Sequence, residues 1–171
     1  ASDLALAQQR GDAILQALES DTGESRSAAL GEIATEGSAV SALVGLFRAS
    51  ELVMMQDPAA ASDVLAALIS QESILGDYSD LALFKQLLLE GSGLDASARR
   101  AGFEQLSAAG NPLRLLAQEQ LALLDLQEND ETAAVKRLRD LLQDAEMTQN
   151  LRQRLGQLMV ALGQDPNALD G

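Results

Sequence analysis

Residues 110–142 read GNPLRLLAQEQLALLDLQENDETAAVKRLRDLL, and this stretch decides the fold. Leucine and alanine recur in it every three or four residues, which is the spacing of one face of an α-helix. Gly110-Asn111-Pro112 is a strong turn and helix-start signal, and Asn129-Asp130 interrupts the pattern halfway. The stretch therefore predicts two helices joined by a short turn, a helical hairpin.

The same alternation of apolar helical segments and breaks extends over the rest of the chain. Asp57-Pro58 pairs a capping residue with a first-turn proline, and Ser38 is a further N-cap candidate. The fifth helix carries leucines on nearly every side, so it is expected to be the most buried one. The nine expected helices cover about residues 2–19, 24–35, 38–56, 58–70, 77–90, 95–108, 112–128, 131–144 and 148–162.

Composition favours an all-α fold and argues against two classes of partner. Hydrophobic residues make up 47% of the 171 residues and aromatic residues only 2%, so the core must be built mainly from leucine and alanine, both strong helix formers. The net charge of −14 argues against binding to nucleic acid or to anionic lipid. Residues 1–98 hold 15 acidic and 4 basic side chains, against 11 and 8 in residues 99–171. We expect a solvated acidic surface, with attraction of a basic partner as the alternative.

The sequence offers little catalytic chemistry. It contains no histidine and no cysteine, which excludes Ser-His and Cys-His sites and imidazole or thiolate zinc sites. Gly91-Ser92-Gly93 lacks the spacing and the lysine of a phosphate-binding loop. The acidic pairs Asp77/Asp80 and Asp130/Glu131 fall at expected helix N-termini, where capping accounts for them. We therefore expect no enzyme activity and no catalytic, cofactor or metal site.

The spacing of the helices indicates a repeat. Alternate helices from the third onward begin near residues 38, 77, 112 and 148, at intervals of 39, 35 and 36 residues. An array of helical hairpins with about 34 residues per unit gives such intervals once its loops have drifted, whereas a simple bundle has no reason to keep them.

These hairpins resemble tetratricopeptide (TPR) repeats, in which a small residue of the first helix meets a small residue of the second. The turns match at Gln56-Asp57 and Asn129-Asp130. The consensus aromatics are mostly replaced by leucine, no proline closes the unit that ends near Glu146, and the unit at 77–108 matches poorly. The resemblance implies a right-handed, all-α solenoid. Its expected repeat-packing residues are Ala49 and Ala61, Ala122 and Ala134, and Gly156 in a terminal half-unit.

One branch of these repeats is more similar than the others. Residues 110–124 and the run Asn150-Leu-Arg-Gln-Arg-Leu resemble the TPR-like domain of bacterial inner-membrane-anchored, periplasm-facing proteins related to the ancillary subunit of the Sec translocon. The similarity covers most of residues 38–163. It implies a transmembrane anchor before Ala1, and translocon subunits or periplasmic chaperones as partners.

The expected organisation is an N-terminal helical extension or cap at 1–37, TPR-like repeats at 38–163 and a flexible tail at 164–171. The expected function is that of a non-catalytic protein-interaction scaffold on the periplasmic side of a bacterial inner membrane, in secretion or envelope protein quality control. Two alternatives remain open: a cytosolic adaptor or regulator built on the same repeats, and a structural protein whose apolar grooves close on a second copy.

Candidate binding residues are the adaptable Met54 and Met55 and the basic trio Arg114, Arg152 and Arg154. The methionines end the third helix, where a hairpin repeat opens its groove; filling of an irregular core is their default role, and a binding surface is the alternative. The arginines are a candidate docking face for an acidic peptide. The alternative is that they form surface ion pairs with neighbours on the same helix.

Overall fold

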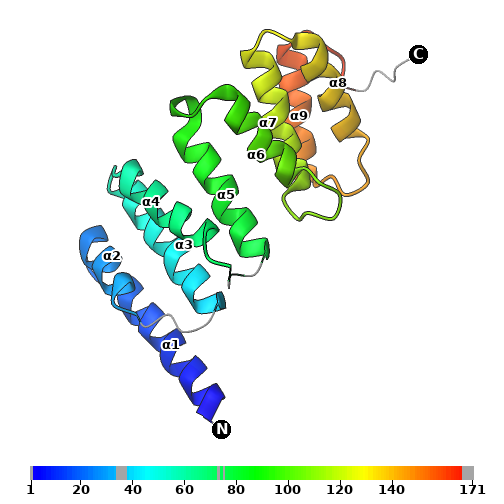
Figure 1. Ribbon diagram of the computed structural model, residues 1–171. Helices are drawn as coiled ribbons and strands as arrows, with labels where there is room; N and C mark the ends of the chain where they lie inside the picture. Colours follow the sequence, from blue (N-terminus) through cyan, green and yellow to red (C-terminus); the bar gives the residue numbers. More distant parts are fainter. Residues whose placement is uncertain (1, 34–37, 73, 75, 167–171) are drawn as a thin grey trace. The chain divides into compact units, whose positions relative to one another are not determined.

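A computed structural model describes residues 2–33, 38–72, 74 and 76–166, and this part of the chain is all-α (Figure 1). It contains nine α-helices and one short 3-10 helix. They are α1 (Ser2–Leu18), α2 (Gly23–Gly31), α3 (Ser38–Met54), α4 (Pro58–Ile69), α5 (Gly76–Glu90), η1 (Gly91–Gly93), α6 (Ala96–Leu106), α7 (Arg114–Gln127), α8 (Glu131–Leu142) and α9 (Gln149–Ala161). The nine predicted helices are thus confirmed, with ends displaced by a few residues.

The chain divides into two compact units, Ala1–Gly93 and Leu94–Gly171. Within each unit the helices pack mainly against their neighbours in sequence. In the first unit α1 contacts α2, α2 contacts α3, α3 contacts α4, and α5 contacts both α4 and α3. In the second unit α6, α7, α8 and α9 pack in the same consecutive way. None of the described helices is long and apolar enough to cross a membrane.

Side-chain caps fix the starts of several helices where the sequence places them. The Asp57 carboxylate accepts a hydrogen bond from the Ala60 amide at 3.0 Å, and the Asp130 carboxylate accepts one from the Ala133 amide at 2.9 Å. These bonds satisfy amides that have no partner inside the helix, and they confirm the capping role of both residues. The side chain of Ser38 lies outside the described residues.

Helices α3 and α7 end in the same way. Gln56 has a φ of 61° and Asn129 a φ of 64°. The Asp57 amide donates to the Leu52 carbonyl at 2.9 Å, and the Asp130 amide donates to the Asp125 carbonyl at 2.8 Å. Together with the shorter bond from each left-handed residue, this is the Schellman arrangement, which satisfies the last carbonyls of a helix.

A third copy of this ending closes α9. Gly163 has a φ of 71°, and the Gln164 amide donates to the Met159 carbonyl at 2.9 Å. Gly163 follows Asn129 by 34 residues. The prediction that Gly163 caps this helix is confirmed. Gln164, where the flexible tail was expected to begin, is held further by a hydrogen bond that the Arg139 guanidinium donates to its side chain at 3.0 Å.

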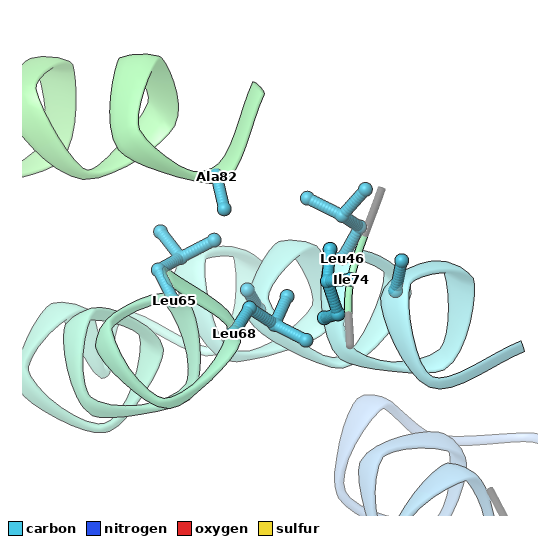
Figure 2. Packing of buried hydrophobic residues seen from close by; sticks show 7 residues of the cluster. Leu46, Leu65, Leu68, Ile74 and Ala82 are labelled. Carbon is cyan, nitrogen blue, oxygen red and sulfur yellow. The ribbon is translucent and has the colours of Figure 1, made fainter. Parts of the chain in front are cut away.

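The core of the first unit lies between α3, α4 and α5. Leu65 and Leu68 of α4 point toward Leu46 of α3 and Ala82 of α5 (Figure 2). Helices α3 and α4 approach so closely that a Cβ atom at Gly45 would lie only 2.7 Å from both methyl carbons of Leu68. Close approach is thus the reason for a glycine at residue 45.

The second unit has its core on α7, which corrects the prediction that α5 is the most buried helix. Six residues of α7 are buried, against three of α5. The reason is the number of neighbours: α7 packs against both α6 and α8, and a side chain of α9 also pairs with it. The leucines of α5 did not reveal which of them stay exposed, and Leu88 is one of these.

The expected packing alanines are all buried. Ala49 and Ala61 lie in the α3–α4 hairpin, and Ala122 and Ala134 lie in the α7–α8 hairpin. Gly156 differs, because a Cβ atom there would meet only Pro166 at an ordinary 3.9 Å. Close helix packing therefore does not explain the glycine at this position. The expected boundary at residue 37 falls outside the described residues, and α2 packs against α3 on the other side of it.

Candidate functional site

An exposed apolar surface runs along α3 and onto α5. Large hydrophobic side chains are normally exposed singly, so a gathering of them on two adjoining helices is a candidate interaction surface. On α3, Leu43, Phe47 and Met54 recur at the helical spacing of one stripe, and Val53 extends the surface beside it. Helix α5 contributes a leucine with 47% of its surface exposed. The members are Leu43, Phe47, Val53 and Met54 of α3, Met55 just beyond its end, and Leu88 of α5.

A groove opens between these two helices within the first unit. Its volume is about 260 Å³, and buried Ala49 and Leu65 lie at its floor. Most of its surface is aliphatic, which suits the burial of apolar side chains of a partner. It is lined by Ala49, Ser50 and Val53 of α3, Leu65 of α4, and Lys85, Leu88 and Leu89 of α5.

Lys85 is the charged member of this lining. Its side chain is half-buried, and it forms no hydrogen bond or ion pair with any residue that the structure describes. The first unit is strongly acidic, with 14 acidic and 4 basic side chains in residues 1–93. Lys85 thus lines a groove that supplies no carboxylate of its own.

The two candidate methionines have different surroundings. Met54 has 73% of its surface exposed and stands clear of the core, as the binding prediction requires. Met55 lies over the start of α2, because a Cβ atom at Gly23 would come within 3.0 Å of its Cγ. Met55 is 41% exposed, so it combines packing against α2 with a contribution to the surface.

The three candidate arginines belong to the second unit and are all engaged within it. The Arg114 guanidinium pairs with Asp144 at 2.8 Å and with Glu146 at 2.7 Å. These hydrogen bonds raise the pKa of Arg114, and Arg114 in turn lowers the pKa of Asp144. An acidic peptide that docks on Arg114 would have to compete with two carboxylates already in place.

Arg152 and Arg154 on α9 reach back to other elements. Arg152 donates a hydrogen bond to the Leu142 carbonyl at the end of α8, at 2.6 Å. Arg154 forms two hydrogen bonds of 2.5 Å with the carboxylate of Glu119 on α7, and this pairing raises the pKa of Arg154. A cavity of about 500 Å³ is lined by Arg114 and Arg154 together with leucines of α7, so the structure brings two of the three arginines to one hollow.

Two acidic side chains are buried in the second unit, and the sequence patterns did not identify them. Glu119 is 6% exposed and Asp125 is 3% exposed. Asp125 pairs with Arg100 of α6 at 2.8 Å and with Arg137 of α8 at 3.0 Å, so its carboxylate joins three helices. Buried charges require such partners. The available signal was the group of arginines on the flanking helices.

This network corrects the expectation that the basic residues pair with neighbours on their own helix. Lys136 does pair in this way, with Asp140 four residues away on the same helix, at 2.9 Å. Arg100, Arg114 and Arg154 instead pair with acids of other elements, because the short α-hairpins bring these elements next to one another.

The described residues contain no group of three or more potential metal-ligating side chains. Asp130 is occupied as a helix cap, and Asp77 lies in the first turn of α5. No protein-family model matches this chain, and no curated protein or solved structure matches it.

Proposed function

We propose that this chain is a non-catalytic protein-interaction scaffold whose binding surface includes the groove between α3 and α5. The exposed apolar surface around Val53, Met54 and Leu88 carries this proposal. Leaving such side chains in water is unfavourable, and covering them with a partner gains about 25 cal/mol for each Å² buried.

We further propose that the helices form TPR-like repeats. The buried pairs Ala49/Ala61 and Ala122/Ala134 occupy equivalent places around their turns and support this assignment. The recurrence of the Schellman ending after 34 residues, at Asn129 and Gly163, supports it as well. In such an array the first helices of successive hairpins line the ligand groove, and α3 and α5 would be two of them.

The proposed setting is the periplasmic face of a bacterial inner membrane, with translocon subunits or periplasmic chaperones as partners. Its support is the sequence resemblance of residues 110–124 and 150–155. A cytosolic adaptor has the same physical requirements, so the setting needs a test separate from that of the surface. Fractionation of cells that express the full-length protein distinguishes the two locations.

Site-specific photo-crosslinking tests the binding surface. A photoreactive residue is placed at Met54 or Leu88 of the full-length protein in its native cells, with Asp63 of α4, which is exposed and polar, as the matched control position. We expect adducts with other proteins from Met54 and Leu88 but not from Asp63, and we expect Val53→Asp to abolish them.

Three other outcomes are decisive. Equal adducts from all three positions would mean that contact is nonspecific, and absence of adducts would contradict the proposed surface. Adducts that contain only a second copy of the chain would support the self-assembling alternative, which the same exposed apolar surface could serve. Sedimentation of the purified protein at several concentrations would then measure that association.

A further inference from the structure

We propose that the groove between α3 and α5 binds an amphipathic helix of the partner, and that this helix carries one acidic side chain on its apolar face, paired with Lys85. This inference rests on the proposed function and names the chemistry of the partner. The main evidence for it is Lys85, a half-buried lysine that lines this largely aliphatic groove. Lys85 forms no hydrogen bond or ion pair with the described residues.

The charge balance makes the lack of a partner informative. With 14 acidic side chains in the first 93 residues, an ion pair for Lys85 was available to this unit, yet the groove contains none. A partner that covers Val53 and Leu88 would remove water from around the ammonium group. Without a carboxylate this burial would be unfavourable, and with one the pair would be strengthened by the less polar surroundings.

The negative charge of the first unit also limits the number of acidic residues that the partner helix can carry. The first unit carries a net charge of −10, so a run of acidic residues would be repelled over most of the approach. A single carboxylate set among apolar residues meets Lys85 and avoids that repulsion. The remainder of the partner helix is therefore neutral or basic.

The length of the apolar surface favours a helix as the binding element. Leu43, Phe47 and Met54 span twelve residues of α3, and the eleven steps between the first and the last correspond to about 16 Å of helix axis. A partner helix with apolar residues at every third or fourth position presents a stripe of this kind over about three turns. A chain end bearing a terminal carboxylate would cover only the region near Lys85.

Selection from a displayed peptide library tests this inference. The library holds helical 16-residue peptides with randomised apolar and polar positions, displayed between two folded domains so that no terminal carboxylate is free. It is selected against the full chain and, in parallel, against the Lys85→Met variant. Methionine keeps the aliphatic stem, and Lys85 makes no polar contact that the substitution would break, so the fold is expected to persist, as circular dichroism would show.

We expect binders of the unchanged protein to carry one Glu or Asp within their apolar stripe, and binders of the Lys85→Met variant to lack this enrichment. For a synthetic binder with blocked ends, replacing that Glu by Gln is expected to weaken binding about tenfold to the unchanged protein and not to the variant. A Leu88→Ser variant serves as a second control, because it is expected to weaken the Glu and Gln peptides equally.

The failures of the two proposals are distinguishable. Binders that depend on Leu88 but show no acidic enrichment, or no difference between Glu and Gln peptides, would overturn the role of Lys85 and leave the groove as a binding site. Absence of binders, or binders indifferent to Leu88→Ser, would overturn both proposals. A second library, whose peptides have free C-termini, covers the remaining case. Binders found only in that library would show that a terminal carboxylate, and not a side chain of a helix, pairs with Lys85.

Discussion

The α3–α4 hairpin and the α7–α8 hairpin share one backbone design but fill it with different chemistry. When the two are aligned on their left-handed turn residues, Leu46 corresponds to Glu119 and Leu52 to Asp125. All four side chains are buried. The first hairpin thus uses leucine at two core positions where the second uses carboxylates.

The residues that contact these positions also differ, being charged in the second hairpin and apolar in the first. Arg137, which pairs with Asp125, corresponds to Val64 of α4 in this alignment, and Val64 packs against the apolar core of the first unit. In the second hairpin, the carboxylates at these positions form ion pairs with arginines of neighbouring helices. The first hairpin has apolar residues at these positions, although Glu51 of α3 pairs with Arg26 of α2 at 2.9 Å, and it leaves apolar side chains exposed on α3. The same local fold can therefore carry paired charges between its helices or an apolar surface that is available to a partner.

The largest expected effect comes from leaving the buried Asp125 without a counter-charge. In the double variant Arg100→Met/Arg137→Met, we expect the free energy of unfolding to fall by about 3 kcal/mol or more, because an unpaired charge would remain in the core. Each single variant should lose much less, since Asp125 keeps one arginine. Urea unfolding of the full chain measures these differences.

Adding Asp125→Leu to that double variant is the control. It places the residue of the first hairpin at the equivalent position, and we expect it to recover most of the lost stability. If the two single effects simply add, or if leucine gives no recovery, the hairpins are not interchangeable at this position and the alignment is wrong there.

The second test addresses close packing, which the first hairpin has at Gly45. Alanine there would place its Cβ 2.7 Å from Leu68, so we expect Gly45→Ala to reduce stability by about 1 to 2 kcal/mol despite the better helix propensity of alanine. Gly156→Ala is the matched control. Its Cβ meets only Pro166, and it should stabilise by about 0.5 to 1 kcal/mol. Thermal unfolding of both variants measures the contrast, and equal effects would contradict it.

The sequence predicted the local features of the fold because they depend on neighbouring residues. The caps at Asp57 and Asp130 and the helix end at Gly163 are set by side-chain and backbone hydrogen bonds within a few residues. The apolar spacing then indicated nine helices. Met54 was recognised as a surface candidate for the same reason, since it stands at the end of a helix whose stripe is local information.

Contacts between helices could not be predicted in this way. Glu119 and Asp125 are polar residues in α7, and only the positions of Arg154, Arg100 and Arg137 on other helices make their burial favourable. The groove at Lys85 likewise depends on how α5 lies against α3. The division of the chain at Gly93 was also missed, because the Gly-rich segment indicated a helix end but not a boundary between two compact units.

A third prediction concerns the turns that the hairpins share. Gln56 and Asn129 both adopt a left-handed conformation, which asparagine tolerates better than glutamine does. We expect Gln56→Gly to stabilise the protein by about 0.5 to 1 kcal/mol and Asn129→Gly by only a few tenths, as measured by urea unfolding. Destabilisation by Gln56→Gly would mean that contacts of the glutamine side chain outweigh its backbone strain.

The smallest expected effect is a pH dependence that arises from an ion pair of the second hairpin region. Arg114 lowers the pKa of Asp144 below its usual 3.8. A carboxyl group with a lowered pKa in the folded state contributes stability above its usual pKa, and this contribution is lost as the pH falls through the folded-state value. Arg114→Met should therefore be less stable than the unchanged protein at pH 6, and the difference should shrink below pH 3.8.

Arg152→Met is the control for this pH effect. Arg152 donates to the Leu142 carbonyl, which does not titrate, so the loss caused by its removal should stay constant over the same pH range. Unfolding by urea at several pH values between 2 and 6 gives both profiles. Parallel profiles for the two variants would show that the Arg114–Asp144 pair is too well solvated to stabilise the fold. Ion pairing would then stabilise the second hairpin through the buried acids Glu119 and Asp125, and not through the pair of Arg114 with Asp144.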